Sequence, residues 1–359
     1  MVRRRKVPSL ADLAAHLANK LRPPFGVVLG SPAEVADLAA SLPEGSTVCF
    51  QVDLFQAGCL HGMPIRAGSV SDGNPAPSLT LPARICTAAD LWDLPEPVQT
   101  LIYPVPRGGE RELKLDMIEQ AFHALAPHGT FVVLSPYERD DFFPRALKKV
   151  FGKVHSPMGT GNAVFWCQRE GDRPRRRHEM TFHVRVDEAT SYSFVSRPGV
   201  FSYGRFDDGA RALTETMVVN EGDRVLDIGC GVGTNGILAA RQAGEGGSVT
   251  FVDSNLRAVA LTELNARNLG VPRFETIATA TLDEVPKDAF DVMLANPPYY
   301  GQLSIAQLFI ERGWAALKRG GCFYLVTKQA EGVYPMIAKV FGEPEAMERR
   351  GYIVFKAQK

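Results

Sequence analysis

The sequence lacks the features that mark several large classes of protein. Its six cysteines are scattered and form no C-x-x-C pair, which argues against a zinc site and suits thiols kept reduced in a cytosol. No apolar run approaches the roughly 20 residues of a membrane span, and the basic N-terminus precedes no apolar stretch typical of a signal peptide. Basic and acidic residues balance at 40 each, so no net charge attracts the whole molecule to nucleic acid. We expect a soluble, cytoplasmic protein with no bound metal and no membrane partner.

The length of 359 residues is enough for two domains that each bury a core. In the second half, short apolar runs alternate with segments of helical periodicity. The runs expected as strands are 224–230, 248–253, 290–295 and 322–327, and the segments expected as helices are 234–243, 256–270 and 305–321. This alternation predicts an α/β fold with a parallel, doubly wound sheet.

The first half looks like a degenerate copy of the same plan. Three pairs of segments match in the same order: the residues around Asp53 with those around Asp253, 121–135 with 313–327, and 148–152 with 338–342. The first copy has one glycine where the second has GCGVG, and our alignment puts Tyr103 opposite Asn296. We therefore predict two tandem Rossmann-like domains with doubly wound sheets, of which the N-terminal one has lost its chemistry.

The expected strand at 224–230 leads into a glycine-rich turn. Glycines at this place let a ligand approach the backbone and direct the next helix N-terminus at it, but the spacing alone also fits a nicotinamide enzyme. Asp227 favours a cofactor with an ammonium and a sulfonium group, because a carboxylate there would repel a pyrophosphate. Asp253 ends the next strand, where it can accept hydrogen bonds from both ribose hydroxyls. The pattern predicts S-adenosylmethionine, bound by Asp227, Gly229, Cys230, Gly231, Gly233, Asp253, Ser254, Thr279 and Asn296.

The segment Asn296-Pro297-Pro298-Tyr299 follows the run at 290–295 and is expected to be catalytic. An exocyclic base amine is a poor nucleophile because its lone pair is delocalised into the ring. The Asn296 side-chain oxygen and the Pro297 carbonyl can accept its two N–H groups, while the prolines stiffen the loop and Tyr299 offers a stacking surface. Catalysis would be mostly positioning. Adenine N6 and a protein glutamine amide need the same two acceptors, so the loop leaves these substrates open.

The second half resembles the bacterial ribosomal RNA guanine-N2 methyltransferases of the small-subunit, RsmC-like type. The resemblance rests on PGVFS at 198–202, Asp207 with Gly209, the glycine-rich turn, Asp253 and the sequence ANPPYYG. That family pairs an inactive N-terminal methyltransferase-like domain with an active C-terminal one. The resemblance implies that the substrate is a guanine amine in ribosomal RNA or a ribosomal subunit. It also implies a polar contact to the cofactor adenine near Ala280, which would have to come from the backbone, Thr279 or Thr281.

The resemblance and the change in composition between the copies together suggest three regions. We expect a degenerate domain at 1–170 that positions RNA, a linker with a β-hairpin at 171–205, and a catalytic domain at 206–359. The linker carries a cluster of basic residues, Arg173, Arg175, Arg176, Arg177 and His178. Such a cluster fits either contact with RNA phosphates or a solvated connection between domains.

Overall fold

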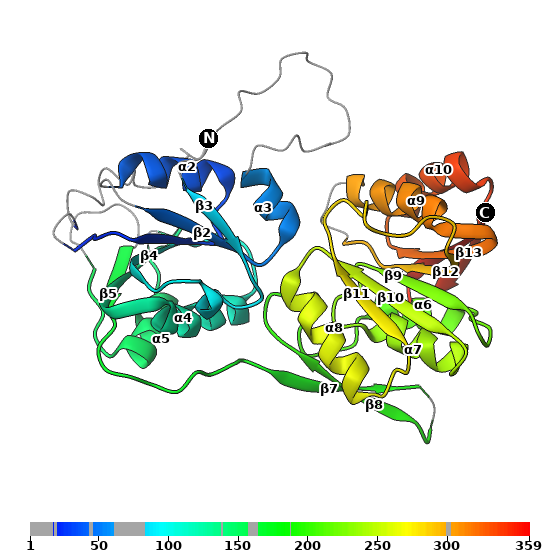
Figure 1. Cartoon of the computed structure of the whole chain (residues 1–359), viewed down its shortest axis with the longest axis horizontal. Coiled ribbons are helices and arrows are strands. Elements are labelled where there is room, and N and C mark those ends of the chain that lie inside the picture. The colour runs from blue at the N-terminus through cyan, green and yellow to red at the C-terminus, as the bar shows by residue number, and fades with distance from the viewer. Residues whose placement is uncertain are drawn as a thin grey trace, which may run out of the picture. The chain divides into compact units, whose positions relative to one another are not determined.

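A computed structural model describes residues 17, 20–42, 46–60, 83–137, 139–156, 164–186, 188–298 and 303–359. The described residues fall into two compact units, one ending at His178 and the other beginning at Glu179 (Figure 1). Each unit is an α/β layer structure with a mostly parallel sheet between helices. The predicted tandem doubly wound fold is therefore confirmed.

The sheet of the first unit has the strand order β3-β2-β1-β4-β5-β6, in which only the β5–β6 pairing is antiparallel. Its strands are β1 (Phe25–Val28), β2 (Thr47–Gln51), β3 (Arg84–Thr87), β4 (Val98–Pro104), β5 (Leu125–Leu134) and β6 (Val164–Gln168). Its helices are α2 (Pro32–Ser41), α3 (Leu54–Leu60), the 3₁₀ turn η1 (Leu91–Asp93), α4 (Arg111–Ala124) and α5 (Phe142–Phe151).

The second unit begins with the antiparallel hairpin β7 (Met180–Arg185) and β8 (Ser191–Ser196), which is the hairpin expected between the copies. Its main sheet has the order β11-β10-β9-β12-β13-β15-β14. The strands are β9 (Arg224–Ile228), β10 (Ser248–Asp253), β11 (Phe274–Ala278), β12 (Phe290–Ala295), β13 (Leu317–Thr327), β14 (Glu345–Arg349) and β15 (Tyr352–Gln358). The helices are α6 (Asp208–Thr216), α7 (Thr234–Ala243), α8 (Leu256–Asn268), α9 (Ser304–Ala316) and α10 (Ala330–Phe341).

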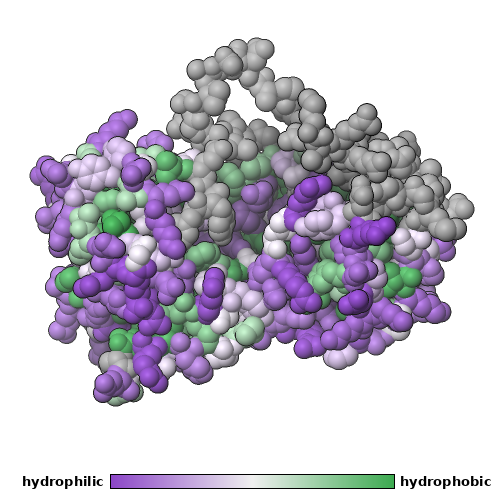
Figure 2. All heavy atoms as spheres, turned by 180° about the vertical axis from the view of Figure 1, so that it is seen from behind, coloured by the Kyte–Doolittle hydropathy of each residue, from purple (hydrophilic) through white to green (hydrophobic). Residues whose placement is uncertain are grey.

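Helices cover both faces of this second sheet: α6, α7 and α8 pack on one face and α9 and α10 on the other (Figure 1). Strand β9 is buried from both sides, with Val225 in the cluster under α7 and Leu226 and Ile228 in the cluster under α9. A parallel strand covered on both faces needs such a continuous apolar run. Most of the described residues visible on the face in Figure 2 are hydrophilic, with hydrophobic residues scattered among them.

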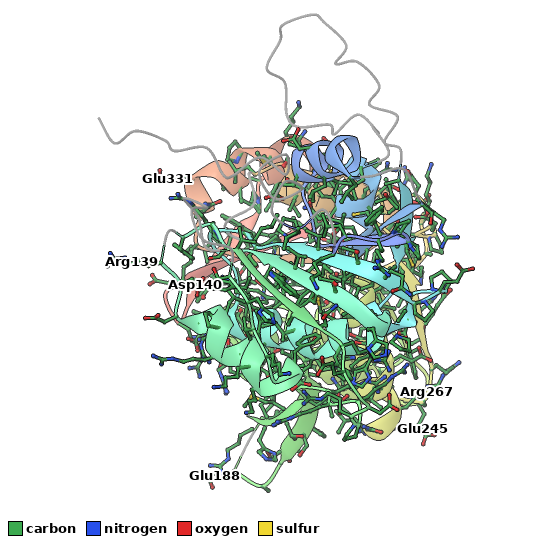
Figure 3. All side chains as sticks on the ribbon, turned by 90° about the vertical axis from the view of Figure 1, so that its left-hand side faces the viewer. Arg139, Asp140, Glu188, Glu245, Arg267 and Glu331 are labelled. Carbon is green, nitrogen blue, oxygen red and sulfur yellow. The ribbon has the colours of Figure 1, made fainter. Side chains whose placement is uncertain are left out.

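The β7–β8 hairpin packs on the second unit rather than standing free as a linker. Phe182 and Phe194 stack at 5.7 Å between ring centroids, and both are buried in the core cluster under α7 and α8. Asn265 of α8 joins the hairpin to the turn after β9, because its side chain bonds the backbone of Val195 and of Val232. Glu188, by contrast, lies at the tip of the hairpin and points away from the ribbon (Figure 3).

The two sheets repeat the same strand order and the same ladder irregularity. The sequence β3-β2-β1-β4-β5-β6 corresponds to β11-β10-β9-β12-β13-β15. Leu125 pairs with Val98 just before a register shift, and Leu317 pairs with Phe290 just before the equivalent shift. The predicted alignment of Leu125 with Leu317, and with it the internal duplication, agrees with this register.

The same register corrects the predicted match of Asp53 with Asp253. The Leu29 N–H donates to Phe50 O at 3.0 Å, as the Gly229 N–H donates to Val252 O at 2.8 Å. Counting onward from these bonds, Gln51 takes the place of Asp253, and Asp53 takes the place of Asn255. Asp53 and Asn255 each accept an N–H of the following helix, so the two equivalent residues act as helix caps in both units.

Tyr103 was also placed one residue out of register. The β4–β5 ladder pairs Tyr103 with Val133, and the β12–β13 ladder pairs Ala295 with Leu325, which is the corresponding residue. Pro104 therefore stands where the second copy has Asn296. A proline offers no side-chain acceptor, which agrees with the prediction that the first copy lacks the equivalent of Asn296.

The basic segment between the units is docked on the first unit. Arg173 pairs with Glu119 of α4 at 3.1 Å and donates to Val150 O at 2.9 Å. Arg177 pairs with Asp90 at 3.4 Å. The side chains of Glu119 and Asp90 are only 5% and 3% exposed, so each carboxylate is held by an arginine of this segment. Of the two interpretations of the cluster, a freely solvated connection does not apply to Arg173 and Arg177.

Replacing Arg173 should destabilise the first unit, because Glu119 would lose its partner while staying buried. We expect Arg173→Gln to lower the free energy of unfolding by about 1–3 kcal/mol, below the value for fully buried pairs because Arg173 is partly exposed. Urea unfolding followed by tryptophan fluorescence measures the change. The exposed neighbour provides the control: Arg176→Gln should stay within about 0.5 kcal/mol. Equal effects of the two substitutions would contradict the docked arrangement.

Candidate functional site

The candidate site lies at the carboxyl edge of the second sheet. There β9, β10, β11 and β12 end in register, since Ile228 pairs with both Val252 and Ala295, and Asp253 pairs with Ala278. The residues that follow these strands therefore share one edge. The strand order reverses between β9 and β12, and open α/β sheets bind ligands in the crevice at such a switch point.

The glycine-rich turn after β9 has the backbone that its sequence predicts. Gly229, Gly231 and Gly233 have φ of 69°, 60° and 83°, in the left-handed region that favours glycine. A Cβ at Gly229 would lie 3.1 Å from Phe309, and a Cβ at Gly233 would lie 3.0 Å from Thr262. At Gly231, however, no heavy atom of the described chain lies within 4 Å of such a Cβ. Gly231 is thus the point of the turn where a ligand can approach the backbone.

Asp227 is buried under this turn, at 3% exposure, and accepts a hydrogen bond from the Gly236 N–H at 2.8 Å. Burial raises the pKa of the Asp227 carboxyl to about 7; the Gly236 bond opposes the rise and the charge of Asp253 adds to it. Gly236 is a site residue that our sequence analysis missed. A Cβ there would lie 2.8 Å from the Asp227 carboxylate, so glycine makes room for the acid in the first turn of α7.

Asp253 ties the second strand end to the glycine turn. One carboxylate oxygen accepts the Gly231 N–H at 3.0 Å and the other accepts the Asn255 N–H at 2.9 Å. Cys230 lies between the two acids and is buried, and burial together with the charges of Asp253 and Asp227 raises its thiol pKa well above the ordinary value. The turn therefore concentrates negative charge, which suits a cationic ligand.

The next two loops hold the other predicted cofactor residues. Ser254 follows Asp253 and is partly buried, but the cap of α8 is Asn255, which accepts the N–H groups of Arg257 and Ala258. Thr279 directly follows β11 and is buried. Its hydroxyl donates to Glu284 and accepts the N–H groups of Thr281 and Leu282, so it shapes this loop from within.

The predicted catalytic loop begins where β12 ends. Asn296 is partly buried, and its Nδ2 donates to the Asp207 carboxylate at 3.2 Å. Pro297 is buried and Pro298 partly buried. Tyr299 lies outside the described residues. The structure thus brings Asn296 and its prolines to the same sheet edge as Asp227, Asp253 and the glycine turn.

The segment before α6 is held to this edge by side chains that the sequence analysis did not single out. Arg257 of α8 is 1% exposed and donates to the carbonyl of Pro198. Asn255 donates to the carbonyl of Gly199 at 2.8 Å. The PGVFS segment is therefore fixed against α8, beside the Asp253 loop. A buried arginine in a helix gives no sequence pattern that distinguishes it from a solvated one.

The corresponding edge of the first unit is closed. Counted from the paired strands, the turn from β1 to α2 is two residues shorter than the turn from β9 to α7, since α2 begins after Ser31. Ser31 and Glu34 cap each other at the N-terminus of α2, and Gln51 donates to Gly30 O at 2.8 Å. The backbone groups that would meet a ligand are thus satisfied by the unit's own side chains.

Within the described ranges, no helix is long and apolar enough to cross a membrane. The same residues also contain no group of three or more His, Cys, Asp or Glu side chains placed to hold a metal ion.

Known proteins share the organisation of this chain. Residues 191–356 match the methyltransferase small domain family. The chain is 33% identical over 181 residues to ribosomal RNA small subunit methyltransferase C of Chromohalobacter salexigens, covering 48% of this chain and 53% of that protein. It is 28% identical over 229 residues to ribosomal RNA large subunit methyltransferase G of Pseudomonas putida, covering 60% of each. The matches thus span between half and two thirds of these two relatives.

The fold has a counterpart among solved structures. The 16S rRNA N2 methyltransferase RsmC of T. thermophilus, solved in complex with AdoMet and guanosine, aligns with a TM-score of 0.72. The alignment covers 97% of this chain and 92% of that one at 21% identity, so it supports the tandem fold along almost the whole chain. Residues 191–356 therefore match a methyltransferase small domain, and the chain is similar to RsmC-like ribosomal RNA methyltransferases in sequence and fold.

Proposed function

We propose that the chain transfers a methyl group from S-adenosylmethionine to the exocyclic amine of a guanine in ribosomal RNA. The observation that carries this proposal is the meeting of an acidic glycine turn and Asn296 at one switch point of the second sheet. The named relatives methylate ribosomal RNA, and the solved RsmC binds AdoMet and guanosine, which supports the same substrate class here. A site of action on ribosomes implies the cytoplasm.

The residues of the turn fit S-adenosylmethionine. Gly231 leaves its outer side open for close approach, and Asp253, already anchored by two N–H groups, presents a fixed carboxylate for ribose hydroxyls. Asp227 provides the negative charge for the ammonium group. When bound, S-adenosylmethionine supplies an activated methyl group on a sulfonium. Because the Thr279 hydroxyl is engaged within its loop, the adenine contact is assigned to the backbone near Ala280 and Thr281.

Asn296 and Pro297 would act on the nucleophile. The Asn296 side-chain oxygen accepts one N–H of the amine, and the Pro297 carbonyl accepts the other. Both acceptors favour the pyramidal nitrogen that develops as its lone pair attacks, so they stabilise the transition state more than the bound substrate. Tyr299 would stack on the base. The chain positions the amine and leaves the activation of the methyl group to its donor.

The first unit is proposed to position RNA. Its positions equivalent to Gly229, Asp253 and Asn296 hold Leu29, Gln51 and Pro104, so these described positions lack the groups proposed to bind cofactor in the second unit. Regions 1–170 and 206–359 are proposed as RNA-positioning and catalytic domains, and region 171–205 connects them, with its hairpin packed on the second unit. In the basic cluster, Arg175 and Arg176 are exposed and available to phosphates, whereas Arg173 and Arg177 are engaged by buried acids.

Cofactor affinity should depend on pH through Asp227. Its pKa of about 7 in the ligand-free chain means that the carboxyl is protonated at lower pH, while the cofactor ammonium needs it ionised. We expect calorimetry to find one cofactor per chain, with an affinity that falls by up to about tenfold per pH unit below this pKa. Asp227→Asn should weaken binding at pH 8 and remove the dependence.

The same substitution should affect the ligand-free chain in the opposite sense. A raised carboxyl pKa means that the folded state holds a proton that the unfolded state releases, so the stability from this group is lost as pH rises toward about 7. Asp227→Asn removes that loss, and its gain in melting temperature should be larger at pH 8 than at pH 5. A gain in melting temperature that is independent of pH would show that burial does not raise the pKa of Asp227.

Removing the Asn296 acceptor should slow methyl transfer without loosening the complex. By analogy with the loss of one preorganised transition-state hydrogen bond, Asn296→Ala should lower the single-turnover rate on the order of a hundred- to a thousandfold. Cofactor affinity should stay nearly unchanged by calorimetry, because the glycine turn, Asp227 and Asp253 are proposed to provide most of the cofactor contacts. Full turnover on ribosomal RNA would show that the catalytic assignment is wrong.

Contact with RNA phosphates should appear in the salt dependence of binding. Neutralising one arginine that meets a phosphate reduces the slope of log affinity against log salt by about one. The double variant Arg175→Gln with Arg176→Gln should therefore reduce the slope by about two, measured by filter binding to ribosomal RNA at several salt concentrations. Glu179→Gln, on the same exposed segment, is the control. An unchanged slope would leave the two arginines as solvated side chains.

A further inference from the structure

Asp207 is held in place by the start of a helix. It is the N-cap of α6, with φ of −67° and ψ of 140°, and its Oδ2 accepts the Ala210 N–H at 2.9 Å. Behind it α6 is firmly packed, since Ala212 and Leu213 are fully buried in the core cluster under α7. The carboxylate therefore has a fixed position and direction, unlike a side chain on an exposed loop.

The same Asp207 oxygen also accepts a hydrogen bond from Asn296 Nδ2 at 3.2 Å, across 89 residues of sequence. An amide side chain has two ends of nearly equal shape, one a donor and the other an acceptor. An ionised carboxylate only accepts, so the end of Asn296 that faces Asp207 must be its NH₂ group. The side-chain oxygen then points the other way.

This orientation matters for the amine that Asn296 is proposed to hold. The substrate presents N–H groups, which need an acceptor. If the Asn296 amide were turned over, its NH₂ group would face the N–H groups of the substrate, and the hydrogen bond would be lost. A charged partner on the NH₂ end also strengthens the acceptor at the other end, because hydrogen bonds in a chain polarise one another.

We infer that Asp207 is a positioning residue for methyl transfer: it acts through Asn296 by fixing the acceptor oxygen of that amide toward the substrate amine. This inference rests on the proposed function. It assigns Asp207 two roles, helix cap and amide orientation, which different substitutions can separate.

Asp207→Ser separates the two roles. Serine is as good an N-cap as aspartate, so α6 and the melting temperature should be kept. Its shorter, neutral hydroxyl cannot fix the Asn296 amide. A hydrogen bond to a charged group corresponds to roughly a ten- to hundredfold effect, and we expect a loss of that size in kcat with ribosomal RNA, while KM and cofactor affinity stay near wild type. Asp207→Asn keeps one acceptor oxygen and should lose less.

A double-mutant cycle tests whether Asp207 acts through Asn296. In the Asn296→Ala background, Asp207→Ser should slow transfer little further, because the amide it orients is gone. Equal fold-losses in both backgrounds would overturn the inference, as would an Asp207→Ser enzyme with wild-type kcat. If Asp207→Ser lowers the melting temperature, the same cycle with Asp207→Asn decides the question. Failure of the proposed function is distinguishable, since Asn296→Ala alone would then keep its full rate.

Discussion

Every functional group of the second unit depends on how its parallel strands end. Because β9, β10, β11 and β12 stop in register, the residues just beyond them lie at one edge of the sheet although they are far apart in the sequence. Hydrogen bonds then lock this edge: the Gly231 N–H to Asp253, the Gly236 N–H to Asp227 and the Asn296 amide to Asp207. Strand register determines where the site lies, and a few hydrogen bonds to carboxylates orient its side chains and backbone groups.

The two units show how one fold keeps its architecture while its chemistry is lost. They share strand order, a ladder shift and the helix cap at Asp53 and Asn255, yet the first has a shorter turn and a self-capped helix where the second has open glycines. Packing needs only apolar residues of suitable size on the strands, whereas a cofactor turn needs a left-handed backbone that a ligand can approach closely. The first unit meets only the former requirement. In the first unit, Arg173 and Arg177 instead form ion pairs with the buried acids Glu119 and Asp90.

The sequence predicted the parts of the structure that follow from local patterns. Alternating apolar runs indicated the doubly wound sheets and the hairpin, and the spacing of Gly229, Gly231 and Gly233 indicated the turn. The predicted alignment of the two copies was wrong by one residue at Tyr103 and by two residues at Asp53. Similar residue types suggested those matches, whereas the strand register is defined by the hydrogen-bond ladder. The hydrogen-bond partners of Asn296 and Arg173 could not be predicted from the sequence either. They join residues 89 and 54 positions apart, and only the folded chain brings them together.

The identity of the methylated group tests the central claim most directly. Ribosomal subunits from a strain that lacks this gene would be incubated with the full chain and S-adenosylmethionine carrying a deuterated methyl group, then digested and analysed by mass spectrometry. A guanine amine held by Asn296 and Pro297 predicts deuterated N2-methylguanosine as the labelled product. Label recovered as N6-methyladenosine, or in a protein glutamine such as that of a release factor added to the reaction, would contradict the assigned substrate.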